Sequence, residues 1–291
     1  MELPRRDRGD ELLPPGELTD IRRRLRMIAP QHDLVSVIAC AFDHRTRMLP
    51  FIFADTRMVP AGIRAIGSAM VASGFEKTRI VLQQWNRNFR PSRMQLDGRI
   101  PDLFLVSSMG MHLAPCMDMI RDAQRIDPQY RPLIIAGGSL NMYQPYEVFG
   151  NNLSDMAGAD VAVTGEEYVL LNLLEVLLSV RGRGESMLSA FVRARDNGSL
   201  QHVSGLVYAR HENGRFSGEL IDTGIQRLVL NLDELPDPVP GYRLLEAPSR
   251  GVGLARHALS AKSDKKAFAD QFAGVDFWLQ VRVSLLPNSG L

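Results

Sequence analysis

The fold is decided by residues 34–42, which read LVSVIACAF. This run is almost continuously apolar and rich in β-branched residues, as in a strand that is buried on both faces. Four similar short runs follow at residues 78–83, 103–108, 132–138 and 160–165. Strands buried on both faces need helices on both sides, so the five runs predict a parallel sheet inside an α/β domain.

Helical segments separate these runs. Pro60 occupies a favoured first-turn position, and Ile63, Ile66 and Met70 follow at helical spacing before Gly74. Two further helices are predicted over residues 113–126 and 166–180. Strands alternating with helices favour an open, doubly wound, parallel five-stranded sheet with flavodoxin-like, Rossmann-like strand order. A closed eight-stranded barrel would need more repeats.

The chain divides into four segments by composition. Residues 1–33 form a polar lead-in with one helix, and residues 34–180 form the α/β domain. Residues 181–245 predict a small helix, a β-hairpin turning at Asn213-Gly214, and a proline-rich linker. Residues 246–291 are an atypical tail, because three of the four lysines of the chain fall there within five positions.

Composition excludes several classes of protein. With 45% hydrophobic and 23% charged residues the chain is an ordinary globular protein, and its net charge of +1 argues against a nucleic-acid partner. No apolar run approaches the roughly 18 residues that span a bilayer, and the N-terminus has no apolar signal core. We therefore expect a cytoplasmic protein without a membrane partner. Two cysteines exclude a disulfide framework and any all-cysteine zinc or iron–sulfur site within one chain.

The candidate site lies at the carboxyl ends of the predicted strands, where open parallel sheets bind ligands. Small and polar residues gather there, and small residues open a cleft while hydroxyls add hydrogen bonds without bulk. The candidate cofactor-binding residues are Ser107, Ser108, Met109, Gly137, Gly138, Ser139, Thr164, Gly165 and Glu166. No catalytic residue is assigned. No metal site is expected, because no set of His and Glu residues has metal-ligand spacing.

Two histidines beside this edge stay open. His44 adjoins Asp43 and is either a solvated loop residue or a base or ligand; His112 is either a helix-start residue or faces the cleft. Nucleotide-binding fingerprints of the Gly-x-Gly-x-x-Gly and P-loop types are absent. A flavodoxin-like enzyme acting on a nucleotide or sugar-nucleotide, with Asp43 and Glu166 as acid–base groups, remains an alternative. A non-catalytic regulatory or scaffold domain is another.

Residues 34–245 resemble the cobalamin-binding N-terminal domain of cobalamin-dependent radical S-adenosylmethionine (radical SAM) proteins. The stretches that carry this resemblance are VPAGI at 59–63, SSM at 107–109, IIAGG at 134–138, ADVAVTGEE at 159–167, VSGLVY at 203–208 and LDELPDP at 232–238. The resemblance implies a cobalamin cofactor at the strand ends. It implies that the two serines bond the nucleotide tail, that Gly137 and Gly138 let the tail pass, and that residues 164–166 close the far side.

Two departures from the family pattern limit what the resemblance implies. The Asp-x-His-x-x-Gly motif is missing, so cobalamin would bind with its own base displaced and without a protein histidine on cobalt. The Cys-x-x-x-Cys-x-x-Cys motif is also missing, so the chain lacks the iron–sulfur cluster that cleaves S-adenosylmethionine for methyl transfer or radical rearrangement in intact relatives. We expect the tail to be a truncated or frame-shifted remnant of a radical SAM domain. A radical SAM domain or a partner chain is then an expected partner. Reading the encoding DNA in its other frames past Ala261 tests this expectation.

Overall fold

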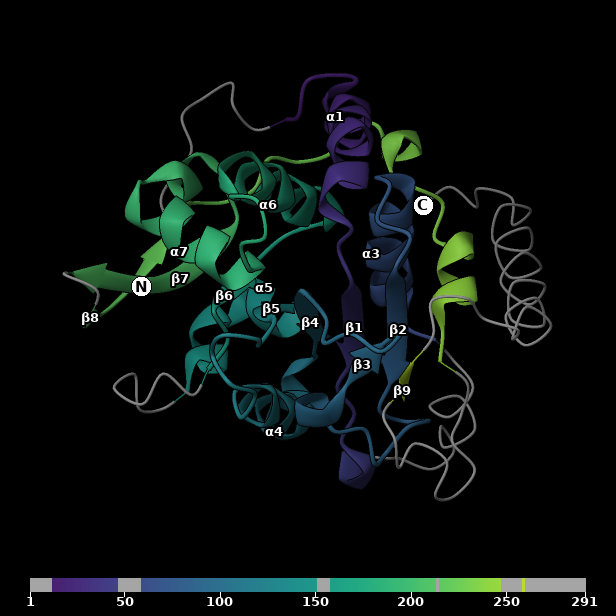
Figure 1. Ribbon diagram of the computed structural model, residues 1–291. Coiled ribbons are helices and arrows are strands. Elements are labelled where there is room, and N and C mark those ends of the chain that lie inside the picture. The colour runs from purple at the N-terminus through teal and green to yellow at the C-terminus, as the bar shows by residue number, and fades with distance from the viewer. Residues whose placement is uncertain (1–11, 47–58, 151–157, 213–214, 247–257, 260–291) are drawn as a thin grey trace, which may run out of the picture.

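The computed structural model describes residues 12–46, 59–150, 158–212, 215–246 and 258–259. A seven-stranded sheet of order β2-β1-β4-β5-β6-β7-β8 is its centre (Figure 1). The strands are β1 (Ser36–Cys40), β2 (Thr78–Leu82), β4 (Leu103–Ser107), β5 (Leu133–Gly137), β6 (Val161–Val163), β7 (Leu206–Glu212) and β8 (Arg215–Asp222). A two-residue strand β3 (Gln95–Leu96) pairs separately with β9 (Ala258–Leu259).

The first five strands of this order are parallel and confirm the α/β prediction. The prediction of a purely parallel five-stranded sheet is wrong, because β7 pairs antiparallel with β6 and β8 pairs antiparallel with β7. The predicted hairpin therefore extends the main sheet instead of standing beside it. The physical reason is that β6, a strand of three residues, pairs with β5 on one side only and would leave its other edge without hydrogen-bond partners. β7 covers that edge with the buried residues Leu206, Val207 and Tyr208.

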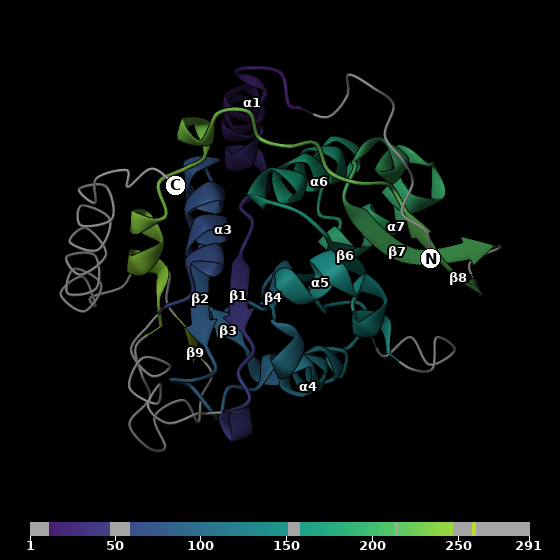
Figure 2. The same cartoon turned by 180° about the vertical axis from the view of Figure 1, so that it is seen from behind.

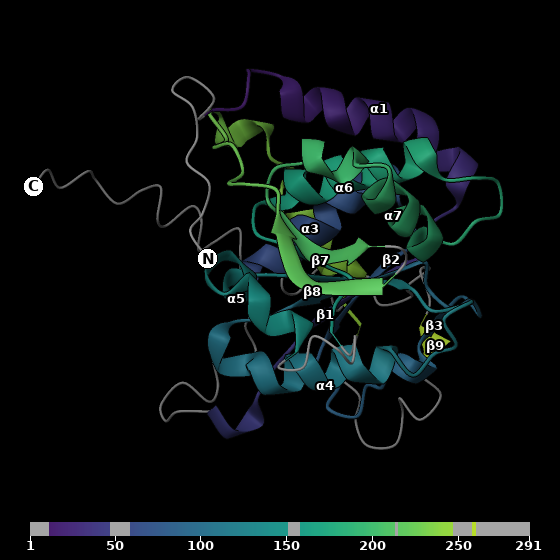
Figure 3. The same ribbon diagram turned by 90° about the vertical axis from the view of Figure 1, so that its left-hand side faces the viewer.

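Helices cover both faces of the sheet (Figure 3). On one face lie α3 (Ala61–Ala72) and α6 (Glu167–Val180), with α1 (Glu17–His32) over them and α7 (Met187–Asp196) beside them. The other face carries α4 (Leu113–Ala123), while the short α5 (Ser139–Tyr143) follows β5. Short helices of the 3₁₀ type are η1 (His44–Thr46), η2 (Pro91–Arg93), η3 (Gly110–His112), η4 (Pro145–Phe149), η6 (Ser199–His202), η7 (Leu232–Glu234) and η8 (Val239–Leu244).

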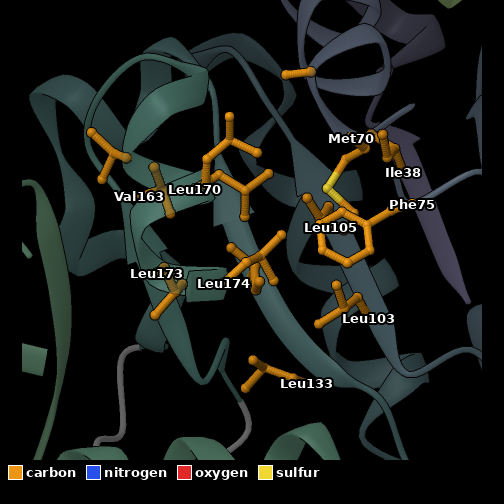
Figure 4. Close-up of a cluster of buried hydrophobic side chains, with 14 of the residues drawn as sticks. Ile38, Met70, Phe75, Leu103, Leu105, Leu133, Val163, Leu170, Leu173 and Leu174 are labelled. Atoms are coloured by element: carbon orange, nitrogen blue, oxygen red, sulfur yellow. The ribbon is translucent and has the colours of Figure 1, made fainter. Parts of the chain in front are cut away.

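Two separate hydrophobic clusters fill the space between these layers, as strand alternation requires. Toward α3 and α6, the strand residues Ile38, Leu105 and Leu133 gather with Met70 and Leu170 (Figure 4). The intervening strand residues, among them Val37, Phe104 and Ile134, pack with α4 in the second cluster. Alternate strand positions thus identify the helix layer that each side chain faces.

A long connection leaves β8 and crosses the molecule (Figure 2). We call residues 223–246 the strap. It passes the first turns of α6 and α1, packs η8 on α3, and ends beside β2, where Leu245 forms a parallel bridge with Ile80. The strap contains the proline-rich stretch that the sequence assigns to a linker.

Most of the predicted C-terminal tail lies outside the described residues. Of the predicted tail at residues 246–291, only Glu246 and the two residues of β9 belong to the described part, so the truncation hypothesis lies outside the described residues. Among the helices of the described residues, none combines the length and the apolar character that crossing a membrane requires.

Candidate functional site

Small side chains form one row at the carboxyl ends of three adjacent strands. Cys40 of β1 is the register partner of Ser107 of β4, which is in turn the partner of Gly137 of β5. Alternation places all three on the face toward α3 and α6. The next row on that face, two residues earlier, is Ile38, Leu105 and Ile135. The layer therefore changes from large aliphatic side chains to a thiol, a hydroxyl and a hydrogen atom. We call Cys40, Ser107 and Gly137 the small-residue row.

Open space lies beside one end of this row. A Cβ atom built on Gly137 would meet no other atom within 4 Å. The neighbouring Gly138 behaves differently, since its φ is +92° and a Cβ there would lie 2.7 Å from Oγ of Ser107 and 2.8 Å from the carbonyl oxygen of Ser108. Gly138 is therefore a glycine because the β4 loop packs against its backbone, whereas Gly137 leaves room that the protein does not fill.

The two serines of the β4 end have different environments. Ser108 is buried; its Oγ donates to the carbonyl of Met109, its N–H donates to the carbonyl of Gly137, and its carbonyl accepts from Leu140. These bonds fix the β4 and β5 ends to each other. Ser107 is half-buried, and its hydroxyl makes no hydrogen bond within the described ranges. Of the two predicted tail-binding hydroxyls, Ser107 is thus the available one.

A buried amide adjoins Gly137. Asn141 of α5 is fully buried, and its Nδ2 donates to the carbonyl oxygen of Gly137 over 2.7 Å. Its Oδ1 accepts no hydrogen bond from any residue that the structure describes. A buried amide oxygen without a donor costs free energy, so a donor that reached Oδ1 would stabilise it. Sequence reasoning missed Asn141, although its place one helical turn after Gly137 was a usable signal.

The β6 end is closed by the chain itself. Gln226 of the strap fills the volume that a Cβ on Gly165 would need, and its Oε1 accepts from the N–H of Glu166 over 2.7 Å. Thr164 is half-buried and donates its N–H to the carbonyl of Gly205. Residues 164–166 therefore follow β6, one strand away from Gly137, and the missing side chain of Gly165 makes room for Gln226. No local signal marked Gln226 in the linker sequence.

The loop that leaves β1 is joined to the loop that leaves β4. The N–H of Asp43 donates to Nδ1 of His112 over 3.1 Å, and the ring of Phe42 lies 5.0 Å from that imidazole. His112 stands at the start of α4, as one of the two alternatives expected, and it is only 3% exposed, so it is a buried link between the two loops. Arg45 beside Asp43 lowers the pKa of that carboxyl to about 2. The ring of His44 also lies against Phe42, at 5.1 Å.

The remaining predicted residues line the outer rim. Met109 is 50% exposed, and Ser139 and Glu166 are exposed as well. Three further large side chains of the same strand-end loops are also exposed: Met111, Met142 and Tyr143. Inside the rim, burial raises the pKa of the Cys40 thiol to about 12, so the row is uncharged at neutral pH. The site thus has an uncharged inner row and an outer edge on which exposed apolar side chains stand beside the polar Ser139 and Glu166.

A pocket of about 170 Å³ lies elsewhere, between α1, α6 and the strap. Four of its polar lining residues are engaged: Arg227 contacts Glu17 at 3.4 Å, Glu175 pairs with Arg24, and the Tyr168 hydroxyl donates to the carbonyl of Arg227. These contacts hold the strap on the helices. Nothing in its lining matches the candidate residues of the strand ends.

Within the described residues, no group of three or more His, Cys, Asp or Glu side chains is placed to hold a metal ion. Comparison of the whole chain with protein-family models, with curated proteins and with solved structures finds no match to any of them.

Proposed function

We propose that this chain is a cobalamin-binding module of the Rossmann-like type, related to the N-terminal part of cobalamin-dependent radical SAM proteins. The observation that carries the proposal is the small-residue row with open space beside Gly137. A slender ligand arm would lie between the sheet and the helices α3 and α6 at this place, beside Gly137. Ligands of open parallel sheets bind at this edge, beside the position where the strand order reverses, which here lies between β1 and β4.

The polar groups of Ser107 in the row and of Asn141 next to Gly137 suit the nucleotide tail of cobalamin. The Ser107 hydroxyl can donate or accept, and the Asn141 Oδ1 accepts from a hydroxyl or amide of the tail. Gly137 leaves room for the tail to pass the end of β5. The exposed Met109 and Met111 offer soft apolar contact to the corrin edge outside the row. Bound cobalamin supplies a cobalt centre for methyl transfer or radical rearrangement, and this chain's residues supply binding and orientation.

The proposal is limited to binding. Residues 1–291 hold two cysteines, fewer than the three of a Cys-x-x-x-Cys-x-x-Cys motif, so these residues would not hold the cluster themselves. Both thiols of this chain are buried. We therefore propose cofactor binding, and no S-adenosylmethionine cleavage, for residues 1–291.

Absorbance after desalting tests the proposal. We expect the purified protein to retain the visible bands of hydroxocobalamin. Gly137→Leu fills the open space and is expected to weaken binding at least about tenfold without unfolding the protein, because that volume is empty. Gly62→Leu is the matched control, since Gly62 is exposed and also has no atom within 4 Å of its Cβ position.

The alternatives give distinct results in the same experiment. Retention of a nucleotide in place of the corrin supports the flavodoxin-like enzyme, and retention of neither supports the scaffold domain; both results contradict cobalamin binding. Equal binding by wild type and Gly137→Leu contradicts the assigned place of the tail.

A further inference from the structure

The strap is fixed at two distant places, one at each side of the small-residue row. At its beginning, the Gln226 side chain lies over the end of β6 and accepts the N–H of Glu166, which is the residue before α6. Gly165 and Gly205 lack side chains where Gln226 lies, and a Cβ on Gly205 would come within 3.4 Å of it. This first anchor therefore holds the first turn of α6.

The second anchor joins the end of the strap to α3 and β2. The Glu246 N–H donates to the carbonyl of Ile80 over 2.7 Å, and its carboxylate lies 3.1 Å from Nε of Arg79. The Arg79 side chain is 1% exposed, so this ion pair is removed from water. On α3, the guanidinium of Arg64 lies 4.2 Å from the ring centre of Tyr242. Removing either charge leaves the other buried, which makes this anchor costly to break.

Between the anchors the strap is bonded to the N-terminal segment. The Leu13 N–H donates to the carbonyl of Leu228 over 2.8 Å, and the Gly16 N–H donates to Oε1 of Glu234 over 2.9 Å. The strap is thus held along its length against the layer that contains α1, α3 and α6. It connects the two helices that border the row, α3 and α6, by a route outside the sheet (Figure 2).

We infer that the strap is a clamp that couples the outer edge of β2 to the first turn of α6 and sets the width of the space beside the small-residue row. Weakening the contacts of Glu246 with β2 makes the bond between Gln226 and Glu166 open more often, and weakening that bond makes the contacts of Glu246 open more often. Equilibrium coupling between two places is reciprocal, so both directions have the same strength. The effect on cobalamin rests on the proposed function; the coupling of the anchors does not.

Amide hydrogen exchange of the full chain, read residue by residue, tests the coupling. The Glu166 amide reports on the first anchor and the Glu246 amide on the second. We expect Glu246→Gln to speed exchange at Glu166 about fivefold or more, and Gln226→Ala to speed exchange at position 246 by a similar factor. Gln201→Ala, at an exposed glutamine outside the strap, is the matched control and leaves both amides unchanged. Gln226 is half-buried, so its variant stays informative if Glu246→Gln prevents folding.

The coupling is overturned if each variant speeds exchange only at its own anchor. Adding hydroxocobalamin to the wild type then tests the connection to the site, with slower exchange expected at both reporter amides. Retained corrin without slower exchange contradicts the link between clamp and site. Loss of corrin on desalting contradicts the proposed function, and the two variants without ligand still decide whether the strap is a clamp.

Discussion

Nδ1 of His112 accepts the backbone N–H of Asp43 over 3.1 Å, across the two loops that leave β1 and β4. These strands lie side by side at the point where the strand order reverses. Nδ1 serves as the acceptor through its ring lone pair. The two loops at the candidate site are therefore positioned by one buried side chain.

Replacing His112 tests this joint. We expect His112→Ala to lower the free energy of unfolding by about 2 kcal/mol, because it leaves a cavity and removes the acceptor of the Asp43 amide. His112→Asn keeps an acceptor and is expected to lose about half as much. Urea unfolding measures both variants. Equal losses for the two would mean that packing against Phe42, and not the hydrogen bond, holds the loops.

Alanine substitutions at the two adjacent glycines of the β5 end are expected to have opposite effects on stability. Gly138→Ala is expected to cost about 3 kcal/mol, because φ is +92° and Ser107 and Ser108 occupy the place of the new methyl group. Gly137→Ala is expected to change stability by no more than about 0.5 kcal/mol, because its Cβ position is empty. Thermal unfolding of the pair provides the comparison. A large loss for Gly137→Ala would show that the space beside the row is needed by the fold itself.

Asp160, in the ADVAVTGEE stretch at residues 159–167, forms a buried ion pair in the structure. Its carboxylate forms two bonds to Arg131, of 2.6 and 2.7 Å, and also accepts the N–H of Ile134. Both side chains of the pair are at most 10% exposed. Asp160→Asn is expected to cost about 3 kcal/mol because it leaves the guanidinium buried without its counter-charge.

An exposed ion pair supplies the control for Asp160. Asp20 bonds Arg23 at 2.8 Å, but the two side chains are 48% and 71% exposed. Asp20→Asn is expected to cost less than about 1 kcal/mol in the same urea titration. Similar losses for the two variants would contradict the role of burial.

Glu167 makes stability depend on pH. Burial at the start of α6 raises the pKa of this carboxyl above its ordinary value, since desolvation disfavours the charged form. The folded pKa thus exceeds the unfolded pKa, and the folded state binds the proton more tightly. Stability is retained at pH below the unfolded pKa and falls as pH rises through the folded pKa. Glu167→Gln, which cannot ionise, is expected to gain stability relative to wild type as pH rises from 4 toward 8, a range set by the ordinary carboxyl pKa of about 4.3.

Both cysteines are expected to be unreactive in the folded protein. Burial raises the pKa of Cys40 and that of Cys116 to about 12, so neither forms thiolate near neutral pH. A thiol reagent should therefore label no cysteine until guanidinium unfolds the chain and then label both together. Early labelling of Cys40 alone would show that the small-residue row opens to solvent in the folded state.

The sequence predicts the local elements well and the long-range pairing less well. Continuous apolar runs identify β1, β2, β4 and β5, because a strand that is buried on both faces carries apolar residues at nearly every position. The hairpin is visible from its Asn-Gly turn, but its place against β6 depends on which edge is open after the helices have packed. No local pattern specifies that edge, so the sheet appears five-stranded from sequence and is seven-stranded in the molecule.

The candidate site, too, is predictable in its local residues and not in its long-range contacts. Strand-end residues such as Ser107 and Gly137 are visible from sequence because their position relative to a buried run is fixed. Contacts that join distant segments are not visible: Asp43 with His112, and Glu166 with Gln226. The role of Gly165 also changes once Gln226 is seen beside it, because a glycine looks the same in sequence whether a ligand or a side chain approaches it.

The antiparallel hairpin also determines where this protein can be cut or fused. A fragment ending at Val180 would leave the three-residue β6 with a bare edge and would remove the cover that Leu206 and Tyr208 give to the interior. Such a fragment invites association with other chains through that edge. Any transplant of the α/β unit into another protein should therefore carry the chain through Glu246, so that the donor piece keeps both of its lateral borders.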